Sequence, residues 1–282
     1  MPSELMGRPE PGAERDLRER ARAIPEAVRA SIALNLLTEE GLPHFHRILS
    51  SHLIENSSWA KWRNLWTAEE DRHGLVLQFY VRAAALFEPV ALERMQFEYL
   101  RQGLEVEWDR DPYKVLVYTS LQERATQLAH AATGKLGSQD EPTIGKLLQS
   151  ISQDEARHYA FYRTAFKEVL ARDPNEALVS ALPIMPGIDM PGVNIHQFSE
   201  LAQIVRRAGI YGPTEYRQIV IELLRFWEIE SLRGLDGRGR EAQEKLMDIP
   251  ARIERLASII ESRQRRKTFS LEIIVGSEFA LD

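Results

Sequence analysis

Two segments of the chain contain a glutamate followed three residues later by a histidine, Glu70–His73 and Glu155–His158. Positions i and i+3 of a helix point the same way, so each segment aims one carboxylate and one imidazole at the same point. Glu39 lies 31 residues before the first of these glutamates, and Glu123 lies 32 residues before the second. The pattern predicts a four-helix bundle made of two helical hairpins, each turning the same residue types inward.

The inward-facing set has the composition of a dinuclear carboxylate site, because two lone glutamates and two Glu-x-x-His units bind the metals of di-iron and di-manganese proteins. The neighbours are apolar: Leu36 and Leu37 precede Glu39, and Leu121 precedes Glu123. Carboxylates buried there without a cation would be very costly, which argues against the alternative that the residues form a solvated face. The candidate metal ligands are Glu39, Glu70, His73, Glu123, Glu155 and His158.

Composition narrows the chemistry further. The chain has 282 residues, 44% of them apolar, and no cysteine, so disulfides, zinc-thiolate sites and cysteine-ligated iron–sulfur clusters are excluded. A metal must be held by oxygen and nitrogen, which suits iron or manganese. With a net charge of −6, a nucleic-acid-binding surface is not expected. No apolar run approaches a membrane span of roughly 20 residues, and the N-terminus has no signal pattern, so we expect a soluble cytoplasmic protein.

The rest of the chain reads as one mostly α domain over residues 14–282 after a flexible arm over 1–13. Pro43 should break or kink the helix that carries Glu39. Proline and glycine make residues 182–193 an irregular connection. A strand at Ser270–Val275 and a turn at Gly276–Ser277 predict a small C-terminal β-hairpin. The expected helices cover 14–23, 26–55, 58–86, 89–103, 112–137, 143–172, 195–208, 213–231 and 239–263.

Further short motifs accompany these glutamates and histidines along nearly the whole chain. They are Leu17–Ala21, Thr38–Glu40, Trp66–Gly74, Gln122–Thr126, Asp154–His158, Gly209–Tyr211, Leu235–Gly237 and Ile249–Ile253. Together they resemble the soluble acyl-[acyl carrier protein] desaturases of the ferritin-like superfamily. The resemblance implies an all-α, ferritin-like di-iron bundle extended by additional helices.

By that resemblance, the six candidate ligands bind two iron ions, with manganese as a substitute, and Glu70 and Glu155 are able to bridge them. Thr126 follows Glu123 by one turn and would help deliver a proton on the oxygen-binding side. A plain hydrogen bond to a helix carbonyl explains it equally well. Asp154 would orient a ligand histidine, and the simpler alternative is a surface aspartate.

The resemblance also implies the reaction and its partners. A double bond would be introduced into a saturated acyl chain on acyl carrier protein, using oxygen and two electrons from a ferredoxin-type donor, in a homodimer. The family pattern has a tryptophan before the first helix, whereas here none precedes Trp59, which puts an electron route through that residue in question. The acyl chain should lie along the bundle. Possible lining residues, each also explained by core packing, are Ile48, Phe79, Ala83 and Leu128.

A basic group near the C-terminus suits an acidic carrier protein, and an exposed helix end with favourable dipole interactions is the alternative. It consists of Arg255, Arg263, Arg265, Arg266 and Lys267. His130, two turns after Glu123, is either a residue behind the metal ligands or a core histidine.

Other functions with the same donor set stay open. A di-iron hydroxylase or N-oxygenase on a specialised carrier-linked substrate would use the same residues. An iron-storage ferritin-like protein would be shorter and lack the helices after residue 175. A ribonucleotide reductase radical subunit would need a tyrosine one turn after His73, where this chain has Leu77.

Overall fold

The computed structural model describes residues 12–104, 109–187, 191–262, 267–274 and 278–281. The N-terminal arm predicted over 1–13 falls almost wholly outside these residues, so its boundary with the helical domain stays a prediction. In the described part of the chain, no helix is both long and apolar enough to cross a membrane.

The described structure is almost entirely helical, as the sequence predicts. Its long central helices are α2 (Glu26–Glu40), α4 (Ser58–Ala84), α6 (Pro112–Gly137) and α7 (Pro142–Arg172). The helical elements around them are α1 (Ala13–Ala21), α3 (Leu42–His52), α5 (Pro89–Gln102), α8 (Pro174–Ala181), η2 (Pro191–Asn194), α9 (Phe198–Arg207), α10 (Pro213–Phe226), η3 (Ile229–Ser231) and α11 (Gly237–Ser262).

Proline and acidic or hydroxyl side chains fix where the long helices begin. Ser57 accepts a hydrogen bond from the Trp59 N–H at the start of α4, and Asp111 accepts two at the start of α6. Helices α5, α6 and α7 all begin at a proline. Proline lacks a backbone N–H, which costs nothing in the first turn because N–H groups there have no partner within the helix. These local signals explain why the predicted bounds of α4 to α7 differ from the observed ones by two residues or fewer.

The predicted break near Pro43 is confirmed. Helix α2 ends at Glu40, and α3 starts at Leu42 with Pro43 in its first turn. Gly41 lies between them, where an added Cβ would come within 2.7 Å of the Tyr99 hydroxyl. Helix α2 therefore ends one residue after Glu39, and α2 and α3 are separate helices.

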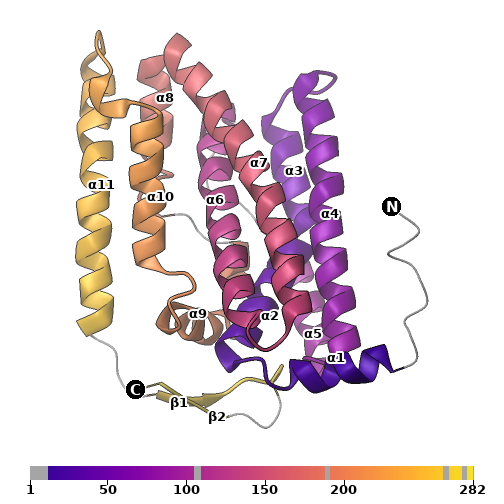
Figure 1. Cartoon of the computed structure of the whole chain (residues 1–282). Coiled ribbons are helices and arrows are strands. Elements are labelled where there is room, and N and C mark those ends of the chain that lie inside the picture. The colour runs from indigo at the N-terminus through magenta and orange to yellow at the C-terminus, as the bar shows by residue number, and fades with distance from the viewer. Residues whose placement is uncertain (1–11, 105–108, 188–190, 263–266, 275–277, 282) are drawn as a thin grey trace.

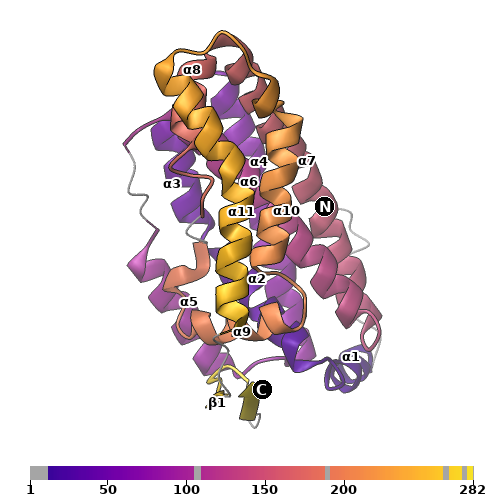
Figure 2. The ribbon, with the colours of Figure 1, turned by 90° about the vertical axis from the view of Figure 1, so that its left-hand side faces the viewer.

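Figure 1 shows α4, α6 and α7 side by side, with α10 and α11 forming a further layer beside α6. Helix α2 packs against α4 and α6 and completes the set of four. Figure 2, a quarter turn away, shows α10 and α11 in front of the bundle and α9 below them. One apolar cluster packs α6 and α7 against α3, α8, α10 and α11. A second packs α2 and α4 against α1, α5 and α9. The four-helix bundle and its additional helices therefore match the predicted fold class.

The C-terminal hairpin exists, but its predicted strand is misplaced. Strand β1 (Lys267–Ser270) pairs antiparallel with β2 (Glu278–Leu281). The apolar run after β1 instead buries Leu271, Ile273 and Ile274 in the second cluster. The Ile273 carbonyl accepts a hydrogen bond from the Glu88 N–H, so core packing takes this run out of the hairpin. The predicted turn at Gly276–Ser277 lies outside the described residues.

Candidate metal centre

Each of the four long helices delivers part of a buried cluster of carboxylates and imidazoles. Helices α2 and α6 each supply one glutamate, and α4 and α7 each supply a glutamate and the histidine one turn later. All of these side chains are buried: Glu39, Glu70, His73, Glu123, Glu155 and His158. The structure thus brings together the whole set of predicted metal ligands.

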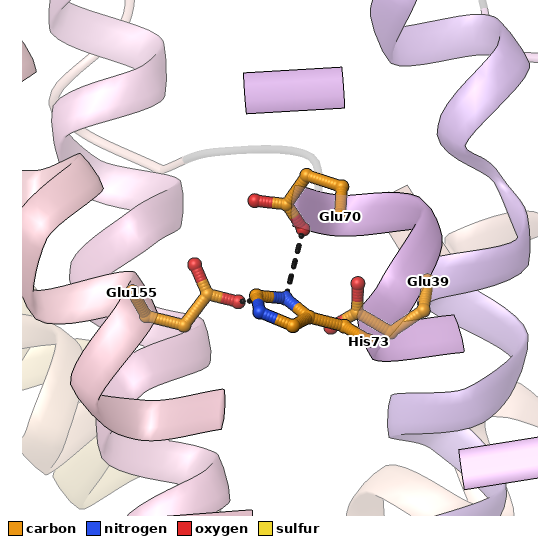
Figure 3. A group of neighbouring side chains, drawn as sticks. All are labelled: Glu39, Glu70, His73 and Glu155. Carbon is orange, nitrogen blue, oxygen red and sulfur yellow. Dashed lines mark ion pairs between the residues drawn. The ribbon is translucent and has the colours of Figure 1, made fainter. Parts of the chain in front are cut away.

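The cluster divides into two overlapping groups of four, in each of which the potential ligand atoms lie within 4.8 Å of one another. One group is Glu39, Glu70, His73 and Glu155, shown in Figure 3. The other is Glu70, Glu123, Glu155 and His158. Glu70 and Glu155 belong to both groups, so each half has its own glutamate and histidine and the two halves share two carboxylates.

Both histidines turn Nδ1 toward the shared carboxylates. His73 Nδ1 lies 3.3 Å from Glu70 Oε2 and 3.4 Å from Glu155 Oε1. His158 Nδ1 lies 2.9 Å from Glu70 Oε1 and 3.2 Å from Glu155 Oε2. The two imidazoles therefore offer the same ring nitrogen to the middle of the cluster.

The outer ring nitrogens meet a second pair of carboxylates. His73 Nε2 lies 3.2 Å from Asp154 Oδ2, and His158 Nε2 lies 2.8 Å from Glu69 Oε2. Arg157 joins the pair from outside, with Nη2 2.6 Å from Asp154 Oδ1 and 3.5 Å from Glu69 Oε1. A carboxylate on the far side of a ligand histidine fixes its tautomer and ring orientation.

Glu69 was missed by the sequence analysis, although a signal for it exists. Asp154 directly precedes Glu155, and 85 residues earlier Glu69 directly precedes Glu70. The same offset relates the two Glu-x-x-His units, so the internal repeat would have identified Glu69 as the counterpart of Asp154.

The two lone glutamates have different neighbours. Glu39 Oε1 lies 3.1 Å from His130 Nε2, and the other ring nitrogen of His130 lies 3.2 Å from Asn35 Nδ2. Glu123 Oε1 instead accepts a hydrogen bond of 3.0 Å from the Trp66 indole. His130 thus contacts a candidate ligand rather than only filling the core, and Trp66 was not anticipated.

Thr126 lies beside the cluster and also has the simple structural bond considered above. Its hydroxyl is 3.1 Å from the carbonyl oxygens of both Gln122 and Glu123. The residue lines the small space among the carboxylates as well as a larger cavity next to it. A hydroxyl in this position can turn from its helix carbonyl toward either space.

The cluster requires positive charge. Burial works to lower the pKa of His73, but Glu155 and Glu70 outweigh it and raise that pKa to about 12. Burial raises the pKa of Glu123 to about 8, even though His158 opposes the shift. Burial also works to raise the pKa of Glu70, but hydrogen bonds from His158 and His73 bring it below its ordinary value. Protons on the imidazoles balance the carboxylates, and metal cations binding there would displace those protons.

The donor set fits a pair of metal ions. His73 Nδ1 and Glu70 Oε1 lie close to opposite charges, yet neither makes a hydrogen bond of good geometry within the described part of the chain. Buried polar atoms without such a bond are costly unless another partner is present. Carboxylate oxygens and imidazole nitrogens without sulfur suit iron or manganese.

A cavity of about 540 Å³ opens beside Glu39 and Thr126. Its apolar walls include Leu34 and Ala129, and Phe198 of α9 covers part of it. None of the proposed lining residues contributes: Phe79 lies on the outer face of α4 with 62% of its surface exposed, and Ile48 is in the first apolar cluster. Ala83 and Leu128 are also absent from the wall. The cavity is built by α2, α6 and α9, which sequence periodicity could not bring together.

The predicted basic group is described only in part. Arg255 is exposed on α11. A groove of about 260 Å³ runs past its neighbours Leu256 and Ile260 and shares Tyr211, Gly212 and Pro213 with the cavity wall. Arg263, Arg265 and Arg266 lie outside the described residues, as does the side chain of Lys267.

Known proteins resemble the chain over most of its length. A family model for the fatty acid desaturases matches residues 10–275. A chloroplastic stearoyl-[acyl-carrier-protein] 9-desaturase of Arabidopsis thaliana is 32% identical over 272 residues, which is 91% of this chain and 68% of that protein. A chloroplastic stearoyl-[acyl-carrier-protein] 9-desaturase of Gossypium hirsutum is 30% identical over 269 residues, covering 90% of this chain and 68% of the relative.

The fold also matches a solved structure. DesA2 of Mycobacterium tuberculosis H37Rv, named as a candidate acyl-ACP desaturase, aligns over 78% of each chain with a TM-score of 0.60 and 21% identity. At that identity the likeness shows the fold alone. The family match and the two relatives go further: the chain belongs to the fatty acid desaturase family.

Proposed function

We propose that the chain is an oxygen-dependent acyl-[acyl carrier protein] desaturase that uses two iron ions. The observation that carries the proposal is the pair of overlapping ligand groups next to an apolar cavity. Glu39 belongs to one of these groups and, with Thr126, also lines the cavity. The stearoyl-[acyl-carrier-protein] 9-desaturases among the relatives support the reaction and the carrier-linked substrate. The proposed iron ligands are Glu39, Glu70, His73, Glu123, Glu155 and His158.

The bound iron pair would supply the oxidising power to remove hydrogen from unactivated C–H bonds, which no side chain has. The protein holds the chain in the cavity so that one pair of carbons lies beside Thr126 and Glu39. Asp154 and Glu69 keep the two imidazoles oriented. Apolar walls exclude water, and Thr126 offers a hydroxyl proton where oxygen is consumed.

The cavity size suits a long, flexible ligand. Its volume of about 540 Å³ falls within the range of roughly 300–1,000 Å³ that is usual for ligand pockets. The groove beside α11 and the cavity share Tyr211, Gly212 and Pro213 in their walls. We propose that a carrier-linked chain enters between them at these shared residues with its free end leading, while the carrier stays outside.

We place the carrier protein next to this groove, with Arg255 as one of its contacts. The supporting observation is that Arg255 is exposed on α11, next to Leu256 of the groove. The variant Arg255→Glu should raise KM for the carrier-linked substrate and leave the iron content normal. Arg15→Glu on α1 reverses the charge of another exposed arginine and is the matched control. An unchanged KM for the Arg255 variant would remove this residue from the docking surface.

A homodimer is the oligomeric state that we propose. Large apolar side chains remain exposed along α4 and α5, among them Phe79 (62%), Val90 (70%) and Phe97 (66%). Apolar surface of this kind is typical of a face that another subunit covers. Sedimentation of the loaded protein tests this, and a monomer at micromolar concentration would contradict it. A ferredoxin-type electron donor and a cytoplasmic location complete the proposal.

A turnover assay decides between the candidate reactions. Iron-loaded protein receives reduced ferredoxin, oxygen and saturated acyl chains of several lengths on acyl carrier protein, and mass spectrometry identifies the products. Loss of two hydrogens from one chain length establishes the desaturase. Gain of one oxygen atom would make the protein a hydroxylase. Iron uptake and oxygen consumption without any product would support iron storage.

A further inference from the structure

Aromatic side chains cluster on the His158 side of the metal centre. The Trp62 ring meets the His158 ring edge-on, with centroids 6.2 Å apart and planes at 88°. Trp62 also stacks on Phe161, with centroids 3.6 Å apart and planes at 19°. Phe161 in turn meets Trp59 edge-on at 5.9 Å. Adjacent rings therefore connect a candidate iron ligand to Trp59.

This series of rings leads toward the protein surface. His158 is buried, whereas Trp62, Phe161 and Trp59 are each half-buried. Trp59 belongs to the first turn of α4, and its neighbour Ser58 is exposed. We call Trp62, Phe161 and Trp59 the aromatic path. None of its members lines the cavity beside Glu39 and Thr126, so it is separate from the proposed acyl site.

The outer nitrogens of both histidines face carboxylates that Arg157 contacts, Asp154 beyond His73 and Glu69 beyond His158, so the difference between the two sides lies in the rings. Among the described residues, tryptophan rings meet His158, whereas the groups beyond His73 are Asp154 and the Arg72 and Arg157 side chains paired with it. These side chains are charged and hard to oxidise. An indole ring, by contrast, is among the protein groups that lose an electron most readily.

We infer that the aromatic path supplies electrons to the metal centre when oxygen has been activated but no acyl chain is bound, and so protects the site from its own oxidant. The inference rests on the proposed function, because a group able to remove hydrogen from an alkyl chain can also oxidise an indole. Trp62 is the first oxidisable ring outside His158 along the path. Electrons would move from the surface inward, and the oxidising equivalent would leave the site.

The electron balance makes the need for such a path plain. Reducing one oxygen molecule to two water molecules consumes four electrons and four protons. In desaturation, the external donor gives two electrons and the two C–H bonds of the substrate give the others. Without a substrate, the second pair of electrons is drawn from the path one electron at a time. Each loss leaves an indole radical cation that keeps its N–H proton, and the protons that form water come from the solvent. The external one-electron donor, a reduced iron–sulfur protein, then reduces the oxidised ring of Trp59, which is half-buried in the first turn of α4.

Trp62 is better suited to this task than Tyr162, which also lies near the site. The two rings meet edge-on at 5.9 Å, and the Tyr162 phenol is fully buried. A phenol must release its proton when it is oxidised. In the described part of the chain the Tyr162 hydroxyl has no acceptor in good hydrogen-bond geometry, whereas an indole can hold the positive charge briefly without losing its proton.

Turnover without a substrate tests the inference. Iron-loaded protein is given oxygen and a limiting amount of reduced ferredoxin, and is frozen rapidly for electron paramagnetic resonance. We expect a tryptophan radical, and later peptides in which Trp62 or Trp59 has gained one oxygen atom. Saturating acyl-carrier substrate should suppress both signals. Absence of the radical and of the modified peptides, while oxygen is still consumed, would overturn the inference and leave the proposed function intact.

Variants supply the second arm of the test. Trp62→Phe should abolish the radical, stop oxidation of Trp59 and shorten the working lifetime of the enzyme several-fold during turnover without substrate. Trp62→Tyr should preserve much of the protection, because the ring remains oxidisable. Trp227→Phe removes a buried tryptophan that packs on Phe166, outside the path, and should change nothing. A wild-type lifetime for Trp62→Phe would also overturn the inference.

Discussion

Glu39 and Glu123 occupy equivalent places in the two helical hairpins, yet their surroundings differ. Glu39 lies next to the break between α2 and α3, lines a cavity of about 540 Å³ and contacts His130. Glu123 lies in the middle of the unbroken helix α6, is 1% exposed and accepts the Trp66 indole. The repeat thus gives both halves the same donor atoms, while the packing around them opens one half and closes the other.

This difference assigns separate tasks to the two halves. The half with Glu39 can receive a substrate, because α9 covers it loosely enough to leave a cavity. The half with Glu123 and His158 is packed against aromatic rings. Oxygen chemistry beside an apolar chain needs both: room for the chain on one side and a rigid, dry support on the other.

The largest expected effect comes from removing each lone glutamate. Glu39→Ala and Glu123→Ala should both abolish turnover, because each deletes a proposed iron ligand. Added formate should restore two bound irons and part of the turnover in Glu39→Ala only, since the cavity admits a small carboxylate there. Iron content by elemental analysis and product by mass spectrometry measure the result. Rescue of both variants, or of Glu123→Ala alone, would break the distinction between an open and a closed half.

The two halves are alike in one respect: a carboxylate contacts the outer ring nitrogen of each histidine, Glu69 at His158 and Asp154 at His73. Glu69→Gln and Asp154→Asn should each weaken iron binding by about 10–100-fold, because each loosens one ligand histidine. Competition with a chelator measures the affinity. Glu222→Gln is a suitable control, since this carboxylate pairs with Arg124 away from the cluster. A large effect for Asp154→Asn with none for Glu69→Gln would show that the repeat does not extend to these residues.

A smaller effect separates the two roles of Thr126. Thr126→Val should lower the amount of product per oxygen consumed several-fold while two irons stay bound, because the hydroxyl beside the cavity is lost. Thr119→Val is the matched control, since Thr119 lies two turns earlier on α6 and donates to the carbonyls of Val115 and Leu116 in the same way. Equal product yields from both variants would show that the Thr126 hydroxyl only forms hydrogen bonds to its helix carbonyls and has no part in the reaction.

The smallest expected effect concerns a buried carboxylate that the protein satisfies without metal. Glu141 caps α7 and accepts hydrogen bonds from Arg20, Tyr80 and the Ile144 N–H. Glu141→Gln should lower the free energy of unfolding by about 1–3 kcal/mol and leave iron binding unchanged. Urea unfolding of the metal-free protein measures it.

The pH dependence of this variant has a definite sign. Burial works to raise the pKa of Glu141, but hydrogen bonds from Thr143 and Ile144 outweigh it and keep the pKa below its ordinary value of 4.5. A carboxyl with a lowered pKa stabilises the fold above its ordinary pKa, and the stabilisation is lost as pH falls through the lowered value. The difference in unfolding free energy between wild type and Glu141→Gln should therefore become smaller below pH 4.5. If this difference stayed constant with pH, the shape of the Glu141 side chain rather than its charge would be what stabilises the fold.

Several features of the site are local enough to predict from sequence. The Glu-x-x-His spacing places a carboxylate and an imidazole on one helix face, and the hairpin spacing brings Glu39 and Glu123 to the same level. Asp154 could be predicted as well, because the family pattern includes it. Trp66 and His130 were harder to assign, since their contacts with Glu123 and Glu39 cross from one helix to another.

The sequence by itself determined the donor set, its two-fold repeat and the helical bundle, because these depend on helix periodicity and on residues one turn apart. Only the tertiary structure decided which half opens on a cavity and which is lined with aromatic rings. The cavity arises where α9 packs against α2 and α6, and the path of rings arises where α4 meets α7. Both depend on contacts between side chains far apart in sequence, which no local pattern encodes.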